Sequence, residues 1–374
     1  MSPAADHDQA CAAGLVDLPG MTPVRLARLL DGFGPGLAWR AVAAGTHPAD
    51  PARRFQSAAR AVDPAETARR YTAAGVEVLL PGRSGYPAAL VGDPGAPAVL
   101  CASGDPSVLE ARPAVAVVGT RSATRYGTRV ASDFGRGLAE AGVVVVSGLA
   151  LGIDAAAHSG ALAAGPGSAP PVAVVGTGLD VIYPREHRPL WERVASEGVV
   201  LSEAALGTPP RPRVFPARNR IIAALSDVVV VVECHGRGGS FHTVEAAARR
   251  SIPVCAVPGA VHSPASRGTN GLLVDGCTPV RDVDDVLTAL SLATGGTPHP
   301  GARRALGSPT EGSPPADDLD RVERAVWEAV DEAPTLVETV LLRTNLSLAA
   351  LTEAGDRLAA RGHLVAGAGW WTRA

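Results

Sequence analysis

Short apolar segments rich in valine recur through the middle of the chain, and they constrain the fold more than any other feature. They lie between residues 112 and 292, with the sequences VAVVGT, VVVVSG, PVAVVGTG, VVLSE, DVVVVVE and PVCAVPG, and helix-like segments separate them. Continuous apolar runs are typical of strands that are buried on both faces of a parallel sheet. The sequence therefore predicts an α/β fold with a Rossmann-like, doubly wound, mostly parallel sheet.

Smaller regions flank this core on both sides. Residues 1–75 are rich in Ala and Arg, and LVDLPGMTPVRLARLLDGFG predicts two helices around a Pro-Gly turn, as in a SAM-like or helix-hairpin-helix domain. Residues 76–111 contain two strand-like runs and predict a connecting hairpin. Residues 293–318 have the Gly, Pro and Ser content of a flexible linker. Residues 319–374 contain three amphipathic helical segments before HLVAGAGWWTR, which predicts a winged-helix-like domain.

Composition excludes several classes of chemistry. The chain contains no lysine, so it has no Walker-type phosphate lysine, no Schiff base and no Ser-Lys dyad. Its net charge of −3 means that a site for a polyanion must be a local cluster of arginines. The five cysteines are scattered without a CxxC pair, so we expect neither disulfides nor a metal site. Because no signal-peptide pattern or run of about 18 apolar residues occurs, we expect a cytoplasmic protein without a membrane partner.

Glycines and hydroxyl side chains follow three of the predicted strands. Glycine allows backbone amides to approach a ligand, and the N-terminus of a following helix favours an anion. The carboxyl ends of parallel strands share one edge of the sheet, so we expect these loops to form a phosphate cradle there. The loop residues are Gly119, Thr120, Arg121, Ser122, Ser147, Gly148, Gly239, Ser240 and Thr243.

The segment VFPARNRII places an aromatic residue and arginines immediately before a helical run. Guanidinium groups suit phosphate oxygens, and the face of Phe215 suits a base, which together are what single-strand binding requires. The candidate residues here are Phe215, Arg218, Asn219 and Arg220. Arg250 belongs instead to VEAAARR, the helical segment after the Gly239–Thr243 loop, where it is a candidate flanking cation. The alternative is that Phe215 packs in the core and the arginines form surface ion pairs.

Enzymatic interpretations of these loops are weaker. Ser147, Asp154 and His158 suggest a hydrolase triad, but Ser147 lacks the GxSxG elbow and the other two lie one helical turn apart. NAD binding is disfavoured because the GxGxxG fingerprint is absent and no acidic residue follows the second strand. We therefore predict no catalytic residue and no cofactor.

Six motifs in one order resemble the DNA-processing protein A (DprA/Smf) family. They are GTRSATRYG, SGLALGIDAAAH, GTGLDVIYPREH, SEAALGTPPRPRVFPARNRIIAALSD, GRGGSFHTVEAA and VPGAVHSPASRGTNGLLVDG. The resemblance implies a non-enzymatic protein that binds and protects single-stranded DNA and dimerises through the Rossmann-like domain. It also implies a role in loading the RecA recombinase during natural transformation (competence) or homologous recombination.

The resemblance also assigns pocket residues by motif position. It implies DNA contacts from Arg121, Phe215, Arg218, Asn219, Arg220, Gly239, Ser240 and Thr243. This chain departs from the family at Leu151, where arginine is common. It departs again at GSFHT, where the family has GSLIT.

Two other functions remain as alternatives. A nucleotide phosphoribohydrolase of the LOG-like group shares this core, but its PGGxGTxxE loop has a different spacing. Here Thr243 lies four residues after Gly239, and Glu245 lies two after Thr243. A duplex-binding regulator would act through the winged helix, but LAALTEAGDRLAARG is electroneutral and predicts a poor reader of the major groove. We favour an interaction role for that domain.

Overall fold

The structure, a computed structural model, describes residues 3–110, 113–212, 214–236, 238–295, 319–331, 335–367 and 369–373. The chain divides into two compact units, Met1–Arg303 and Arg304–Ala374, which are described separately. Most of the predicted linker, from residue 296 to 318, lies outside the described residues. The other predicted domain boundaries stay predictions.

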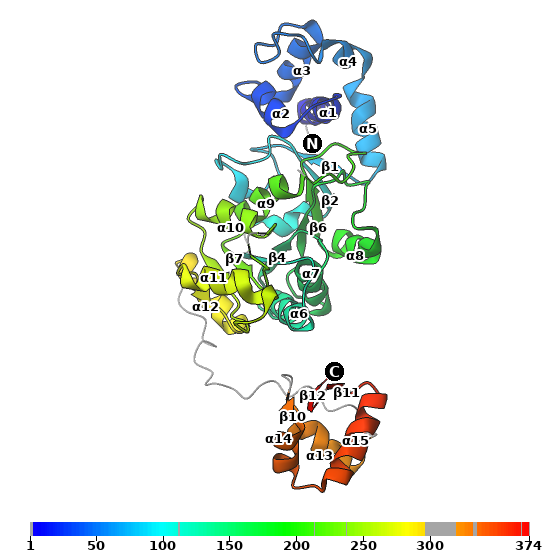
Figure 1. The fold of residues 1–374 in the computed structure, drawn as a ribbon. Coiled ribbons are helices and arrows are strands. Elements are labelled where there is room, and N and C mark those ends of the chain that lie inside the picture. The colour runs from blue at the N-terminus through cyan, green and yellow to red at the C-terminus, as the bar shows by residue number, and fades with distance from the viewer. Residues whose placement is uncertain are drawn as a thin grey trace. The chain divides into compact units, whose positions relative to one another are not determined.

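A nine-stranded sheet forms the centre of the first unit, in the order β1-β2-β6-β5-β4-β3-β7-β8-β9 (Figure 1). The strands from β6 to β9 pair in parallel, and β1 and β2 add antiparallel pairs at one edge. The strands are β1 Glu77–Leu79, β2 Leu100–Gly104, β3 Ala114–Val118, β4 Val144–Ser147, β5 Val172–Val174, β6 Val199–Ser202, β7 Val228–Val231, β8 Val254–Ala256 and β9 Thr278–Pro279. The predicted mostly parallel sheet is confirmed, and the predicted hairpin is part of that sheet.

Alternate residues of each central strand enter opposite hydrophobic clusters, because successive side chains of a strand point to opposite faces. Ala116 and Val118 of β3 pack with helices α9, α10 and α11, whereas Val115 and Val117 pack with α6, α7 and α12. The helices are α6 Arg125–Glu140, α7 Ile153–Ala163, α8 Arg188–Glu197, α9 Val214–Ala224, α10 Phe241–Ala248, α11 Arg267–Val274 and α12 Val283–Ala293. Burial on both faces explains why these strands are continuously apolar.

Helices α1 to α5 precede the sheet among the described residues, and the SAM-like or helix-hairpin-helix assignment stays a prediction. They are α1 Pro3–Asp17, α2 Pro23–Leu30, α3 Pro35–Ala44, α4 Gln56–Ala61 and α5 Pro64–Ala73. Their apolar side chains share one hydrophobic cluster with β1, β2 and α8. Buried Tyr71 donates a hydrogen bond to Asp17, at 2.8 Å, and accepts one from the amide of Leu206, at 3.3 Å. The helical region is therefore joined to the sheet through a common core.

The described residues of the second unit form three helices and a three-stranded antiparallel sheet. They are α13 Arg321–Ala329, α14 Val337–Thr344, α15 Leu348–Ala360, β10 Thr335–Leu336, β11 Leu364–Gly367 and β12 Trp370–Arg373. Buried Glu323 accepts hydrogen bonds from Arg357, at 2.8 Å, and Arg361, at 3.4 Å. Arg357 of α15 and Arg361, the C-cap residue of that helix, are thus engaged inside the unit. The winged-helix assignment stays a prediction.

Candidate functional site

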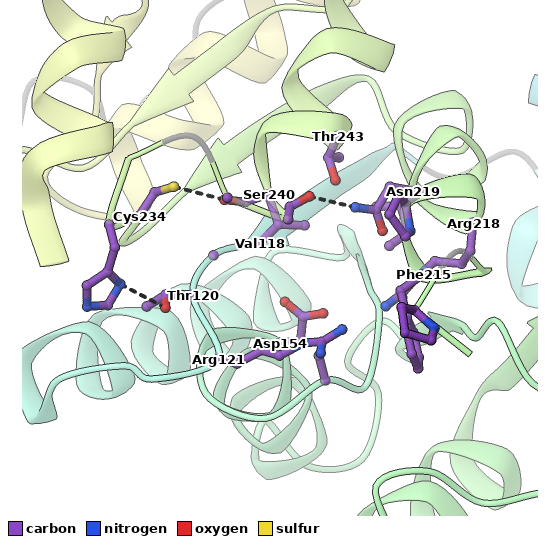
Figure 2. A pocket seen from close by; sticks show the side chains of 18 of the residues that line it. Val118, Thr120, Arg121, Asp154, Phe215, Arg218, Asn219, Cys234, Ser240 and Thr243 are labelled. Atoms are coloured by element: carbon purple, nitrogen blue, oxygen red, sulfur yellow. Dashed lines mark hydrogen bonds between the residues drawn. The ribbon is translucent and has the colours of Figure 1, made fainter. Parts of the chain in front are cut away.

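A cavity of about 640 Å³ lies at the carboxyl ends of the central strands (Figure 2). Its walls come from the segments that follow β3, β4, β5, β6 and β7. The strand order reverses at β3, which has β4 on one side and β7 on the other. Open α/β sheets bind ligands at such a reversal, because the loops on either side of it diverge.

The cavity brings together nine of the fourteen predicted site residues. They are Gly119, Thr120, Arg121, Phe215, Arg218, Asn219, Gly239, Ser240 and Thr243. Asn219 on α9 donates a hydrogen bond from Nδ2 to the Gly239 carbonyl, at 2.9 Å, which joins α9 to the glycine-rich loop. Ser122 is exposed and lies outside the cavity lining.

Ser147 and Gly148 are not among the residues that line this cavity, and they pack behind the residues that do. The Ser147 hydroxyl is fully buried and donates to the Val117 carbonyl, at 2.7 Å. A Cβ atom on Gly148 would overlap the guanidinium of Arg218. Glycine at position 148 therefore lets Arg218 occupy the floor of the cavity, while Ser147 has a structural role.

Arg220 and Arg250 also lie outside the cavity lining, and their contacts with DNA stay predictions. Arg220 Nη2 contacts Glu203 Oε2 at 2.5 Å. Arg250 binds both carboxylate oxygens of Asp93, at 2.6 and 2.8 Å. Their guanidinium groups are held by these partly buried ion pairs; for Arg220, an ion pair is what the alternative interpretation of the sequence predicted.

Internal carboxylates already occupy two of the helix N-termini that the sequence assigns to phosphate. At α6, buried Glu233 accepts hydrogen bonds from the Thr124 amide, at 2.9 Å, and the Thr124 hydroxyl, at 2.5 Å. At α7, Asp154 accepts a hydrogen bond from the Gly148 amide, at 3.1 Å. The first turn of α10 contains no acidic residue. Of the three, the α10 N-terminus is the one suited to a phosphate.

Three ionisable side chains are buried beneath the cavity, on α7 and α9. Arg218 is 4% exposed; Nη1 donates to the Val174 carbonyl and Nε has no partner among the described residues. Burial lowers the pKa of Arg218 to about 10 and raises the pKa of Asp154 above its ordinary value. Burial and the Arg218 charge lower the pKa of His158 to about 3. An unpartnered buried guanidinium nitrogen at a cavity wall is a donor available to a ligand.

Aromatic rings and an arginine form a stack at the same cavity. The guanidinium carbon of Arg121 lies 4.9 Å from the centre of the Phe215 ring. The Tyr183 ring lies 5.5 Å from Phe215 and is 42% exposed. Sequence reasoning missed Tyr183, although its Tyr-Pro pair follows a predicted strand at the same edge of the sheet. It also missed Arg211 and His235, which line the cavity.

The carboxylate required by the phosphoribohydrolase alternative is not at the cavity. Glu245 is exposed, contacts Arg249 at 3.6 Å and His242 at 3.8 Å, and does not line the cavity. Within the described part of the chain, no group of three His, Cys, Asp or Glu side chains lies close enough to hold a metal ion. Nor is any described helix both long and apolar enough to span a membrane.

Comparison with known sequences gives concordant matches. The model of the family "DNA recombination-mediator protein A" matches residues 77–291. The putative DNA processing protein DprA of Mycobacterium tuberculosis is 42% identical over 238 residues, which cover 63% of this chain and 57% of that relative. The match thus spans little more than half of that protein's length. Protein Smf of Synechocystis is 33% identical over 296 residues, or 73% of each chain.

Two solved structures are similar over nearly their whole length. The X-ray structure of DNA processing protein A from Streptococcus pneumoniae superposes with a TM-score of 0.64 and 32% identity, covering 75% of this chain and 96% of that one. DNA processing protein A from Helicobacter pylori, solved for its single-stranded DNA binding mode, gives a TM-score of 0.52 and 30% identity. That match covers 59% of this chain and 97% of the Helicobacter chain.

Proposed function

The chain belongs to the DNA recombination-mediator protein A family, and from this premise we propose that it binds single-stranded DNA in the cavity at β3 and β7. The observation that carries the proposal is the Arg121–Phe215 stack beside the buried, incompletely paired Arg218. Cations together with an exposed aromatic face are what an unpaired strand requires. The Helicobacter pylori relative, which binds single-stranded DNA, supports this assignment.

The proposed mechanism is binding without covalent chemistry. A phosphate lies at the N-terminus of α10, near the amides of the Gly238–Ser240 turn and the hydroxyl of Thr243. Arg121 neutralises a neighbouring phosphate, and Arg218 donates from below. A base stacks on Phe215, with Tyr183 extending the aromatic surface.

We further propose that this binding serves recombination. The bound strand is protected, and RecA is loaded on it during natural transformation or homologous recombination, in the cytoplasm. The chain acts as a homodimer through the Rossmann-like domain. These roles rest on family membership and on the resemblance of the six motifs.

Fluorescence anisotropy of a labelled oligothymidine across a salt series tests the binding site. We expect tight, salt-sensitive binding that duplex DNA of equal length does not displace. Each phosphate neutralised on a single strand contributes about 0.7 to the slope of log affinity against log salt, so Arg121→Ala should flatten the slope by about 0.7. Arg136→Ala, on the exposed side of α6 in an ion pair with Asp133, is the matched control and should leave the slope unchanged.

Absence of binding at low salt would contradict the proposed function. Binding by the wild type with an unchanged slope for Arg121→Ala would instead remove Arg121 from the phosphate contacts. The two outcomes are distinguishable because the first concerns the whole site and the second concerns one side chain.

Replacing Phe215 by alanine should weaken binding of oligothymidine by roughly 5- to 100-fold with little change in the salt slope. The reason is that base–aromatic stacking contributes about 1–3 kcal/mol per base and involves no counterion release. An abasic oligonucleotide of the same length provides the control, since it cannot stack. Equal losses of affinity for the abasic and the thymidine strands would show that Phe215 acts only by supporting the fold.

A further inference from the structure

The cavity contains one acidic side chain among its described lining residues, Asp154. Asp154 lies in the first turn of α7 and is 6% exposed. Figure 2 shows its carboxylate directed into the cavity. A carboxylate at this position affects whether a phosphate or a base of a DNA strand can approach the floor of the cavity.

No direct salt bridge holds Asp154 among the described residues; burial raises its pKa, and the nearby charges of Arg218 and Arg121 act in the opposite direction. Arg121 and Arg218 line the same cavity, but among the described residues neither forms a salt bridge with Asp154. The Asp154 carboxylate accepts hydrogen bonds from the backbone at Gly148 and Ala150, and a carboxylate has further acceptor sites. Such a group repels a phosphate oxygen and accepts a hydrogen bond from an N–H donor.

We infer that Asp154 determines which part of the DNA strand lies at the floor of the cavity. The edge of a base enters the cavity, and a ring N–H of that base donates a hydrogen bond to the Asp154 carboxylate. The phosphates stay near Arg121 and the N-terminus of α10. This inference rests on the proposed function. Thymine N3–H and guanine N1–H are such donors. Adenine and cytosine have exocyclic amino donors, but at the ring nitrogen itself they present a lone pair, which a carboxylate facing that nitrogen repels. Asp154 thus makes the site favour thymine and guanine.

The test compares an oligothymidine with the same strand built from N3-methylthymidine, which stacks but lacks the N–H. For the wild type, we expect the methylated strand to bind on the order of tenfold more weakly, as for loss of one specific base contact. For Asp154→Ala, which removes the acceptor, the ratio of the two dissociation constants should fall close to one. Asp154→Asn keeps a neutral carbonyl acceptor and should give a ratio between that of the wild type and one. Asp227→Asn is the matched control, because its Oδ2 also accepts a backbone amide, that of Ala114, at the opposite edge of the sheet.

A wild-type ratio close to one would overturn the inference, as would a ratio in Asp154→Ala equal to that of the wild type. A second comparison needs no variant: the wild type should bind oligothymidine several-fold more tightly than oligocytidine, and equal affinities would also overturn it. Failure of the wild type to bind unmodified oligothymidine would instead contradict the proposed function. Melting temperatures of the variants establish that they are folded.

Discussion

Arg218→Met is expected to weaken single-stranded DNA binding by about 10- to 100-fold while raising the melting temperature by a few degrees. Hydrogen bonds from a charged donor contribute about 1.5–3 kcal/mol, so removal of the guanidinium is costly for binding. In the free protein the same group is buried with an unpartnered Nε and forms no ion pair among the described residues. The effective cost of burying one charged group is several kcal/mol, so an apolar side chain of similar length at this position is expected to stabilise the fold.

Anisotropy titration and thermal unfolding on the same preparation measure the two effects. Arg136→Met, which removes an exposed arginine from an ion pair with Asp133, is the control and should change neither quantity appreciably. A variant with normal affinity would place Arg218 outside the binding contacts. A lower melting temperature would show that the bond from Arg218 to the Val174 carbonyl outweighs the cost of burying the charge.

The wild type should lose about 2 kcal/mol of stability between pH 7 and pH 5 because of His158, and His158→Leu should not show this loss. The pKa of His158 is about 3 in the folded chain, against about 6.5 in the unfolded chain. Above pH 6.5 both states are neutral, so the stability is fully present. As the pH falls toward 3, the unfolded chain binds a proton that the folded chain excludes, and stability decreases.

Urea unfolding at both pH values measures the difference between the variant and the wild type. His262→Leu, in an exposed loop, is the matched control for loss of a histidine and should retain the wild-type pH dependence. If wild type and His158→Leu lose equal stability on acidification, then His158 is not responsible for it. Comparing the two proteins at each pH isolates His158 from the other titrating groups, Asp154 included.

These expectations share one physical basis, namely that polar groups beneath the cavity are buried before any ligand binds. Gly148 has no side chain, and Arg218 fills the space that a Cβ would occupy. His158 has no partner for either ring nitrogen within the described residues. Incomplete pairing of buried polar groups costs stability in the free protein, and it is expected where function requires donors ready for a ligand.

The sequence by itself determined the sheet and the edge at which the site lies. Continuous valine runs require strands buried on both faces, and glycine-rich segments after those strands meet at one edge because parallel strands end together. Arg121 was predicted in this way, whereas Phe215 and Arg218 were predicted from an aromatic residue and arginines ahead of a helical run; all three line the cavity. The sheet and its ligand-binding edge could be predicted because both follow from the residue pattern within each strand and in the segment directly after it.

Only the tertiary structure decided which of the candidates face the cavity. Arg218 and Arg220 are two positions apart on α9, so they point to nearly opposite sides of the helix. Glu203 and Asp93 hold Arg220 and Arg250, and Glu233 occupies the N-terminus of α6. These partners lie 17, 157 and 109 residues away in the sequence. Charge pairing is set by distance in space, and a local pattern contains no information about such distant partners.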